Sequence, residues 1–197
     1  MSLDEICCVS FFRGLAPADV LRRFGPPGAS VEQMTIGDLW GVADEYALET
    51  DGGDGGGYVG AVQANGWSVA IEPLGWYAIL EEYYTAFSLG CEMVAVSRHD
   101  YAEDRFVYAA EGEAITVFDP FWPPRRWGSD PDRLSRAMRK VGLPTEPADA
   151  RAAALSRVAP DRLAPSFALA AEITGVPFTH DLWKSPLFVG PVDQRLG

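Results

Sequence analysis

The stretch of sequence that decides the fold is residues 58–72, which read YVGAVQANGWSVAIE. Asn65 and Gly66 supply the positive φ angles that a two-residue hairpin turn requires. The segments on either side of this dipeptide are rich in residues that favour extended structure, and they predict two antiparallel strands. The sequence therefore predicts a β-hairpin over residues 58–72 with a type I′ or closely related turn.

Working outward from this hairpin, short apolar runs predict further strands on both sides. These runs are residues 6–12, 93–96, 106–109 and 115–118. Apolar residues at helical spacing predict two helices, over residues 17–24 and over residues 76–88. The first of these begins with Pro17. Residues 31–50 fit a short helix and a strand equally well. The glycine-rich tract 51–57 is interpreted as a flexible connector.

Helical signals dominate after Asp119-Pro120. A helix is predicted to start near Pro131 and to stop at Gly142. Two more are predicted over residues 148–158 and 165–174, and a single turn from Thr179 to Trp183. Strands followed by helices are the α+β pattern.

The predicted fold class is accordingly a single α+β domain over residues 1–197. It comprises a sheet-rich part, residues 1–120, and a helical part, residues 121–197. We expect a mostly antiparallel sheet of five to seven strands with two packed helices and a C-terminal helical cap.

Composition excludes several classes of protein. Hydrophobic residues make up 48% of the 197 residues, which is too many for a disordered chain. No apolar run approaches the roughly 20 residues that cross a bilayer, so no membrane partner is expected. The first residues carry acids and lack the features of a secretory signal. The three cysteines suit neither a disulfide framework nor a zinc site, and a cytoplasmic protein with reduced thiols is predicted.

Charge is distributed unevenly along the chain. The net charge is −12, but residues 1–120 hold 20 acids and 5 bases, whereas residues 121–197 hold 8 acids and 11 bases. An acidic front repels phosphate backbones, so nucleic acid is not expected as a partner unless the arginine-bearing part binds it alone. Arginine outnumbers lysine 14 to 2, which indicates a GC-rich bacterial genome.

Several motifs together resemble an uncharacterised protein family of actinobacteria, over nearly the whole chain. They are Arg13-Gly14-Leu15 with Pro17 and Val20-Leu21-Arg22-Arg23, Asp104-Arg105-Phe106 with Tyr108 and Gly112, Phe118-Asp119-Pro120, and Ile173-Thr174-Gly175-Val176. The family pattern often has a polar cap before the first proline, where Ala16 stands here. The resemblance implies a bacterial cytoplasmic protein and assigns no functional residue.

No catalytic or metal-binding constellation is recognised in the sequence. His99 and His180 are the only histidines, and neither His-x-x-x-His, Cys-x-x-Cys nor Gly-x-Ser-x-Gly occurs. Cys91 is separated from His99 by eight residues, roughly 25 Å along an extended strand, so the two cannot pair there. No catalytic residue, metal ligand or cofactor is therefore predicted.

The segment 121–127, FWPPRRW, carries the candidate binding residues. Trp122, Arg125, Arg126 and Trp127 are of the types enriched in binding hot spots. The alternative is a structural loop that fastens the helical part to the sheet, with buried tryptophans and arginines paired to acids. The structural alternative implies that Arg126→Ala costs little beyond one ion pair.

Two functions from different classes remain open. The first is a non-enzymatic protein-binding factor of immunity type or with a regulatory role, whose acidic, sheet-bearing surface engages a protein. The second is an enzyme or small-ligand receptor with a pocket between the sheet and the helical cap. A cleft with an unpaired buried arginine and a perturbed carboxylate favours the second function.

Overall fold

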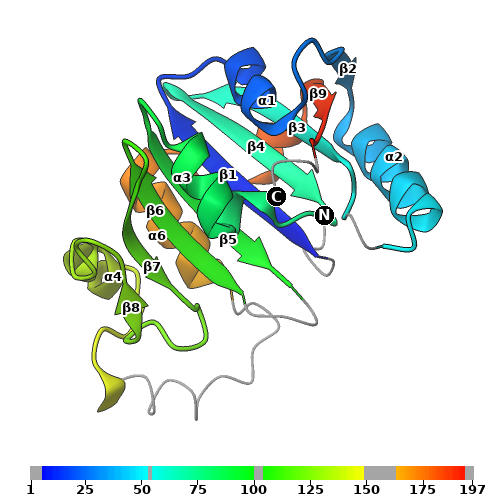
Figure 1. Ribbon diagram of the computed structural model, residues 1–197. Coiled ribbons are helices and arrows are strands. Elements are labelled where there is room, and N and C mark those ends of the chain that lie inside the picture. The colour runs from blue at the N-terminus through cyan, green and yellow to red at the C-terminus, as the bar shows by residue number, and fades with distance from the viewer. Residues whose placement is uncertain (1–5, 53–54, 100–103, 149–162, 194–197) are drawn as a thin grey trace.

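The computed structural model describes residues 6–52, 55–99, 104–148 and 163–193. Its strands are β1 (Cys7–Arg13), β2 (Glu32–Met34), β3 (Tyr58–Ala64), β4 (Trp67–Pro73), β5 (Glu92–Arg98), β6 (Arg105–Ala110), β7 (Glu113–Phe118), β8 (Arg126–Trp127) and β9 (Leu187–Pro191). Its helices are α1 (Pro17–Phe24), α2 (Ile36–Glu49), α3 (Glu81–Phe87), α4 (Ser135–Lys140) and α6 (Ala164–Thr174), with 3₁₀ turns η1 (Tyr77–Ile79) and η2 (His180–Trp183). All nine strands form one sheet in the order β2-β9-β3-β4-β1-β5-β6-β7-β8 (Figure 1).

This architecture shows that the predicted fold class is wrong. The described residues form nine antiparallel strands and five α-helices, instead of five to seven strands with two helices and a C-terminal cap. Strands β2 and β8 have three and two residues, too short for an alternating pattern to be recognised. Strand β9 contains glycine and proline, which weaken a strand signal. The C-terminal residues therefore contribute two strands to the sheet as well as helices.

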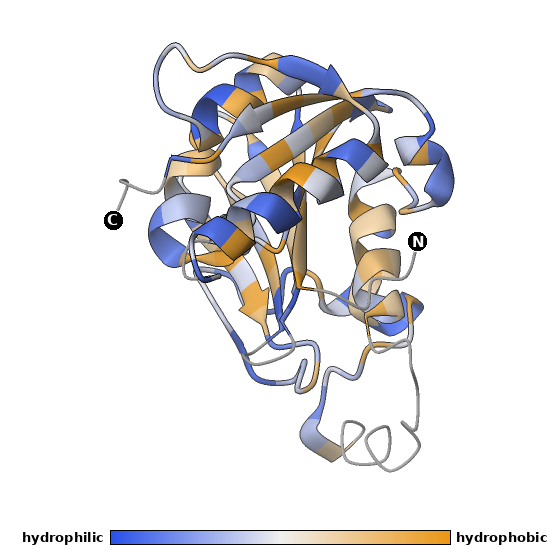
Figure 2. Ribbon diagram, turned by 90° about the vertical axis from the view of Figure 1, so that its right-hand side faces the viewer, coloured by the Kyte–Doolittle hydropathy of each residue, from blue (hydrophilic) through white to orange (hydrophobic). Residues whose placement is uncertain are grey.

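Helices cover both faces of the sheet, and strand alternation divides the core between them. In β1, Val9 and Phe11 join a cluster with residues of α2, α4 and α6, and we call this side the α6 face. Cys8 and Phe12 join a second cluster with residues of α1, η1 and α3, and we call that side the α3 face. Figure 2 shows apolar segments in the interior of this arrangement and polar segments mainly outside. The central strands are buried on both sides.

The predicted hairpin over residues 58–72 is confirmed. Strands β3 and β4 pair antiparallel, and Ala64 lies opposite Trp67 across the turn. Asn65 and Gly66 have φ angles of 47° and 77°, as a type I′ turn requires.

The ambiguous segment 31–50 contains the helix α2, preceded by the short strand β2. A capping box starts this helix: the Thr35 hydroxyl accepts a hydrogen bond from the Asp38 backbone N–H at 3.2 Å, and the Asp38 carboxylate accepts one from the Thr35 N–H at 3.3 Å. The helix predicted over residues 76–88 is divided in two, because Leu80 between η1 and α3 has an extended backbone.

The glycine tract is packed rather than flexible at residues 55–57, all of which are buried. A Cβ atom on Gly56 would lie 2.0 Å from the carbonyl oxygen of Pro73. On Gly57, which has a φ of 64°, it would lie 2.5 Å from the Tyr46 ring. Only glycine allows the backbone to approach this closely.

The helical predictions in the second part of the chain have mixed outcomes. The helix predicted over residues 165–174 is confirmed as α6, which ends at Gly175 with a φ of 68°. The predicted turn to Trp183 is confirmed as η2. Helix α4 is shorter than predicted, because residues 131–134 form turns. The helix predicted over residues 148–158 lies almost entirely outside the described residues.

Cys7, Cys8 and Cys91 are buried and form no disulfide bond. Among the helices of the described ranges, none combines the length and apolar character that crossing a membrane requires.

Candidate functional site

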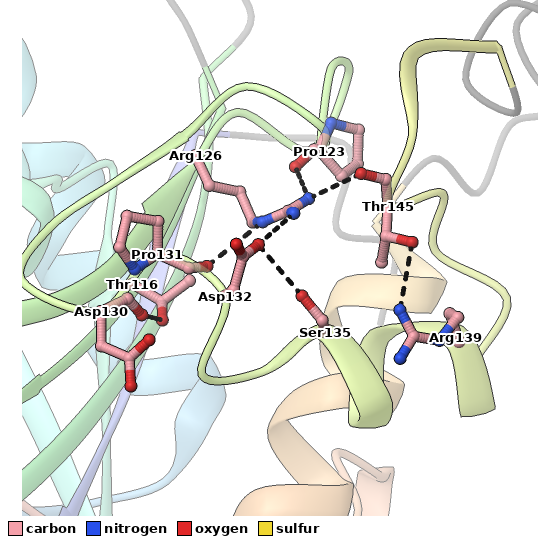
Figure 3. A network of polar contacts seen from close by, with 9 residues as sticks. All are labelled: Thr116, Pro123, Arg126, Asp130, Pro131, Asp132, Ser135, Arg139 and Thr145. Carbon is pink, nitrogen blue, oxygen red and sulfur yellow. Dashed lines mark hydrogen bonds and ion pairs between the residues drawn. The ribbon is translucent and has the colours of Figure 1, made fainter.

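Arg126, at the centre of the predicted site, is directed into the protein. Its guanidinium donates hydrogen bonds to the backbone carbonyls of Pro131 at 3.2 Å, Pro123 at 3.0 Å and Thr145 at 3.2 Å (Figure 3). It also forms an ion pair with Asp132, at 2.6 Å between Nη2 and Oδ1, while its own side chain is 8% exposed. Arg126 therefore joins three segments of the chain, and it acts as a structural residue.

The other three predicted site residues take no part in the hydrogen bonds of the Arg126 side chain. Trp127 follows Arg126 in β8 and so points to the opposite face of the sheet. There its ring lies 5.7 Å from the guanidinium carbon of Arg105 and remains 40% exposed. Arg125 is exposed and Trp122 is partly buried. The segment thus contains one buried, hydrogen-bonded arginine, while its other candidate side chains are exposed or partly buried.

A different group of side chains forms an open groove on the helical side of the molecule. The groove encloses about 730 Å³ and has one carboxylate among its lining residues. It is lined by Arg133, Arg136, Ala137, Arg139, Lys140 and Glu172. Because all four cations are exposed, their charges face solvent. We call this feature the basic groove.

Local sequence explains how α4 and the turn before it present these cations. Leu134 and Met138 are buried against the α6 face of the sheet, which fixes the inward side of the helix. Positions one or two residues away from this apolar stripe project outward, and the cations occupy them. The groove thus follows from the helical period of this segment.

Two of the four cations have partners inside the protein. The ammonium group of Lys140 lies 2.7 Å from each carboxylate oxygen of Glu172, which is on α6. Arg139 contacts the Thr145 hydroxyl at a long 3.5 Å. Within the described residues, Arg133 and Arg136 make no side-chain hydrogen bond or ion pair. These two guanidinium groups are the open end of the basic groove.

The charge of Arg133 also acts on a neighbouring ion pair, which joins the strands β1 and β5. Arg13 pairs with Glu92 at 2.5 Å, and the Tyr108 hydroxyl donates to the same carboxylate at 2.8 Å. The hydrogen bond from Arg13, then that from Tyr108 and the charges of Arg13 and Arg133, hold the pKa of Glu92 below its ordinary value. The carboxylate of Glu92 is therefore ionised, and the charge of Arg13 balances it.

Glu72 is the one strongly perturbed carboxylate of the described residues, and it lies on the opposite face of the sheet from the basic groove. It is 1% exposed and accepts hydrogen bonds from the backbone N–H groups of Tyr77 at 2.8 Å and Ala78 at 3.1 Å. Burial raises its pKa to about 7, although these amides and the thiol of Cys8 oppose the rise. Glu72 fastens the start of η1 to β4.

An unpaired buried arginine and a perturbed carboxylate in one cleft would favour a receptor or enzyme pocket, and neither is found among the described residues near segment 121–127. The buried arginine, Arg126, is fully engaged with protein groups, and Glu72 lies on the α3 face. Within the described residues, no three His, Cys, Asp or Glu side chains gather in a way that could hold a metal ion.

Sequence reasoning missed the basic groove, although a signal for it was present. Arg136, Arg139 and Lys140 lie three, six and seven residues after Arg133, a spacing that predicts one side of a helix. Leu134 and Met138 mark the other side. Glu172 is 32 residues away from Lys140 and no local pattern connects them.

Fold and site together define an antiparallel-sheet protein with helices on both faces and a cationic groove along α4. The chain belongs to a family of unknown function, DUF6461, whose model matches residues 1–195. The expected membership of an uncharacterised family over nearly the whole chain is thus confirmed. Neither a curated protein nor a solved structure shows significant similarity to it.

Proposed function

We propose that this chain is a non-enzymatic protein-binding factor that captures an acidic segment of a partner protein in the basic groove. The observation that carries the proposal is the segregation of charge. Four exposed cations line one groove of a chain whose net charge is −12. Complementary charge favours the encounter with an acidic partner and selects against other partners.

The dimensions of the groove favour a short acidic segment. The helical part of the groove, residues 135–140, spans about 8 Å at the rise of a helix, which is comparable to two or three residues of an extended peptide. Screening limits the reach of these cations to about 8 Å at physiological ionic strength. A longer polyanion such as nucleic acid is disfavoured, because the chain as a whole carries a net charge of −12. The groove therefore suits a few carboxylates within a polypeptide.

A small anionic ligand is the second candidate. Its support is the groove volume of about 730 Å³, which falls within the range of ligand sites. The lining counts against it, since ligand sites are mostly apolar and the basic groove has alanine as its one apolar residue. The acidic polypeptide segment remains the first candidate.

The proposed setting is the cytoplasm of a bacterium, in an actinobacterial lineage. Three buried thiols without disulfides suit a reducing compartment, and the arginine bias suits a GC-rich genome. An immunity or regulatory role is compatible with a factor whose action is to bind an acidic partner.

The test measures binding of a fluorescein-labelled peptide of eight glutamates by fluorescence anisotropy at 50 mM and 300 mM salt. We expect binding that weakens with salt, and a Kd at least about tenfold higher for Arg136→Glu, because a like charge replaces an open guanidinium. Arg125→Glu is the matched control, since Arg125 is exposed but lies outside the groove.

Three outcomes decide the proposal. Tight binding that Arg136→Glu weakens and Arg125→Glu leaves within about twofold supports it. No binding by the unmodified protein at 1 mM peptide contradicts it. Displacement of the peptide by citrate or pyrophosphate at much lower concentration than unlabelled peptide shifts the assignment to the small-ligand candidate.

A further inference from the structure

The ion pair between Lys140 and Glu172 occupies one end of the basic groove. Both oxygens of Glu172 lie 2.7 Å from the Lys140 nitrogen, so a single carboxylate binds the ammonium group through both of its oxygens. The pair joins α4 to α6 and is accessible to solvent, with side-chain exposures of 66% for Lys140 and 35% for Glu172. A carboxylate is thus already bound where an acidic partner would place one.

We propose that Glu172 is a built-in competitor: its carboxylate holds Lys140 in the unbound protein, and a carboxylate of the acidic segment displaces it. This inference rests on the proposed function. Arg133 and Arg136 receive the first carboxylates, because neither has to release an internal partner. Lys140 then exchanges one carboxylate for another.

The surroundings of Glu172 allow this exchange. Helix α6 is held by side chains such as Phe167, Leu169 and Ala170, which are buried in the core of the α6 face, so it does not need the ion pair to stay in place. Exposed ion pairs contribute little to stability. Once displaced, Glu172 can turn to solvent and remain hydrated, which leaves no buried charge without a partner.

Glu172 sets the number of carboxylates that a partner segment must supply before it gains a contact with Lys140. A segment with one or two carboxylates is satisfied by Arg133 and Arg136 and gains nothing at Lys140. A denser acidic segment must supply a further carboxylate that outcompetes Glu172. Glu172 thereby makes the groove select for the density of negative charge.

The experiment compares Glu172→Gln with the unmodified protein in the same anisotropy assay. Removal of the competitor should lower the Kd for the octaglutamate peptide by about threefold to fivefold, the range that an exposed ion pair permits. Glu146→Gln is the matched control. It removes the same charge from an exposed site next to Thr145, which contacts Arg139, and should change the Kd by less than about twofold.

The Lys140→Gln background separates competition from general repulsion. With Lys140 absent, Glu172 no longer blocks a landing point, so Glu172→Gln should give no larger gain than Glu146→Gln does. An equal gain with and without Lys140 overturns the inference. The melting temperatures of all variants should agree within about 3 °C, because the substituted side chains are exposed.

The inference and the proposed function fail in different ways. If the unmodified protein binds the peptide and Arg136→Glu weakens binding, but Glu172→Gln does not tighten it, Glu172 is not a competitor and the proposed function stands. If the unmodified protein does not bind the peptide, the proposed function itself is contradicted.

Discussion

Two single residues show how a polar side chain is retained inside this protein. Arg126 is buried because three backbone carbonyls and Asp132 accept its hydrogen bonds, and Glu72 is buried because two backbone amides donate to its carboxylate. Both join segments that are separated by loops. Burial raises the pKa of the Glu72 carboxyl to about 7, so this group titrates near neutrality.

Glu72 makes stability depend on pH. Its pKa in the folded protein is about 7, above the ordinary value of 4.5, so the folded state holds the proton more tightly than the unfolded state does. The stabilising contribution is complete below pH 4.5 and is lost as the pH rises through 7. Urea unfolding at pH 5 and pH 8 should show a loss of about 2 kcal/mol that Glu72→Gln abolishes.

The control for this prediction is Glu82→Gln, a substitution of an exposed carboxylate on α3. It should leave the difference between pH 5 and pH 8 unchanged. If Glu72→Gln retains the full pH dependence, another group is responsible.

Arg126 contributes more to stability than a surface ion pair does. Arg126→Ala would leave buried carbonyl groups without donors and should lower the free energy of unfolding by about 2 to 3 kcal/mol. This exceeds what the sequence alone indicates. Arg125→Ala, a neighbouring change at an exposed side chain, should stay within about 0.5 kcal/mol. Equal effects of the two substitutions in urea unfolding would contradict a structural role for Arg126.

At the scale of elements, the hairpin turn was readable from the sequence, whereas the capping box of α2 and the short strand pairings were not. The Asn65-Gly66 turn predicted its hairpin because the requirement for positive φ is contained in two residues. Strand β8 consists of Arg126 and Trp127 and exists only because β7 lies beside it, which no local pattern reports. Likewise, the orientation of Arg126 depends on carbonyls up to 19 residues away.

Two glycines in neighbouring elements are expected to respond oppositely to alanine. A Cβ at Gly56 collides with the Pro73 backbone, and Gly56→Ala should cost at least about 2 kcal/mol. Gly41 lies in α2 with no atom within 4 Å of an added Cβ, and Gly41→Ala should stabilise by up to about 1 kcal/mol. Chemical denaturation of the two variants measures both effects. A destabilised Gly41→Ala would mean that the outer side of α2 is covered.

At the scale of the whole molecule, the sheet is completed by a strand from the end of the chain. β9 pairs with β2 on one side and with β3 on the other, and it buries Leu187 and Val189 in the α6 face. Composition and charge could predict neither this insertion nor the pairing of Lys140 with Glu172, because both depend on contacts between distant segments.

Loss of β9 should therefore affect the whole molecule rather than one edge. A chain ending at residue 186 would expose the side of β3 and leave β2 without a partner, so we expect loss of cooperative unfolding and a tendency to aggregate. Circular dichroism melting and size-exclusion chromatography of this chain, beside the full-length protein, provide the measurement. A truncated chain that melts cooperatively as a monomer would show that β9 is dispensable.

The position of β9 also orders events during synthesis on the ribosome. Met34 of β2 pairs with Leu187, which is made 153 residues later. At roughly 5 to 20 residues per second, the intervening chain takes about 8 to 30 s to translate. From the time β3 is made until β9 follows, the growing polypeptide carries β3 as an open edge that another nascent chain can join. Aggregation of this protein is thus expected mainly during translation, when neighbouring ribosomes on one messenger RNA hold several unfinished chains close together.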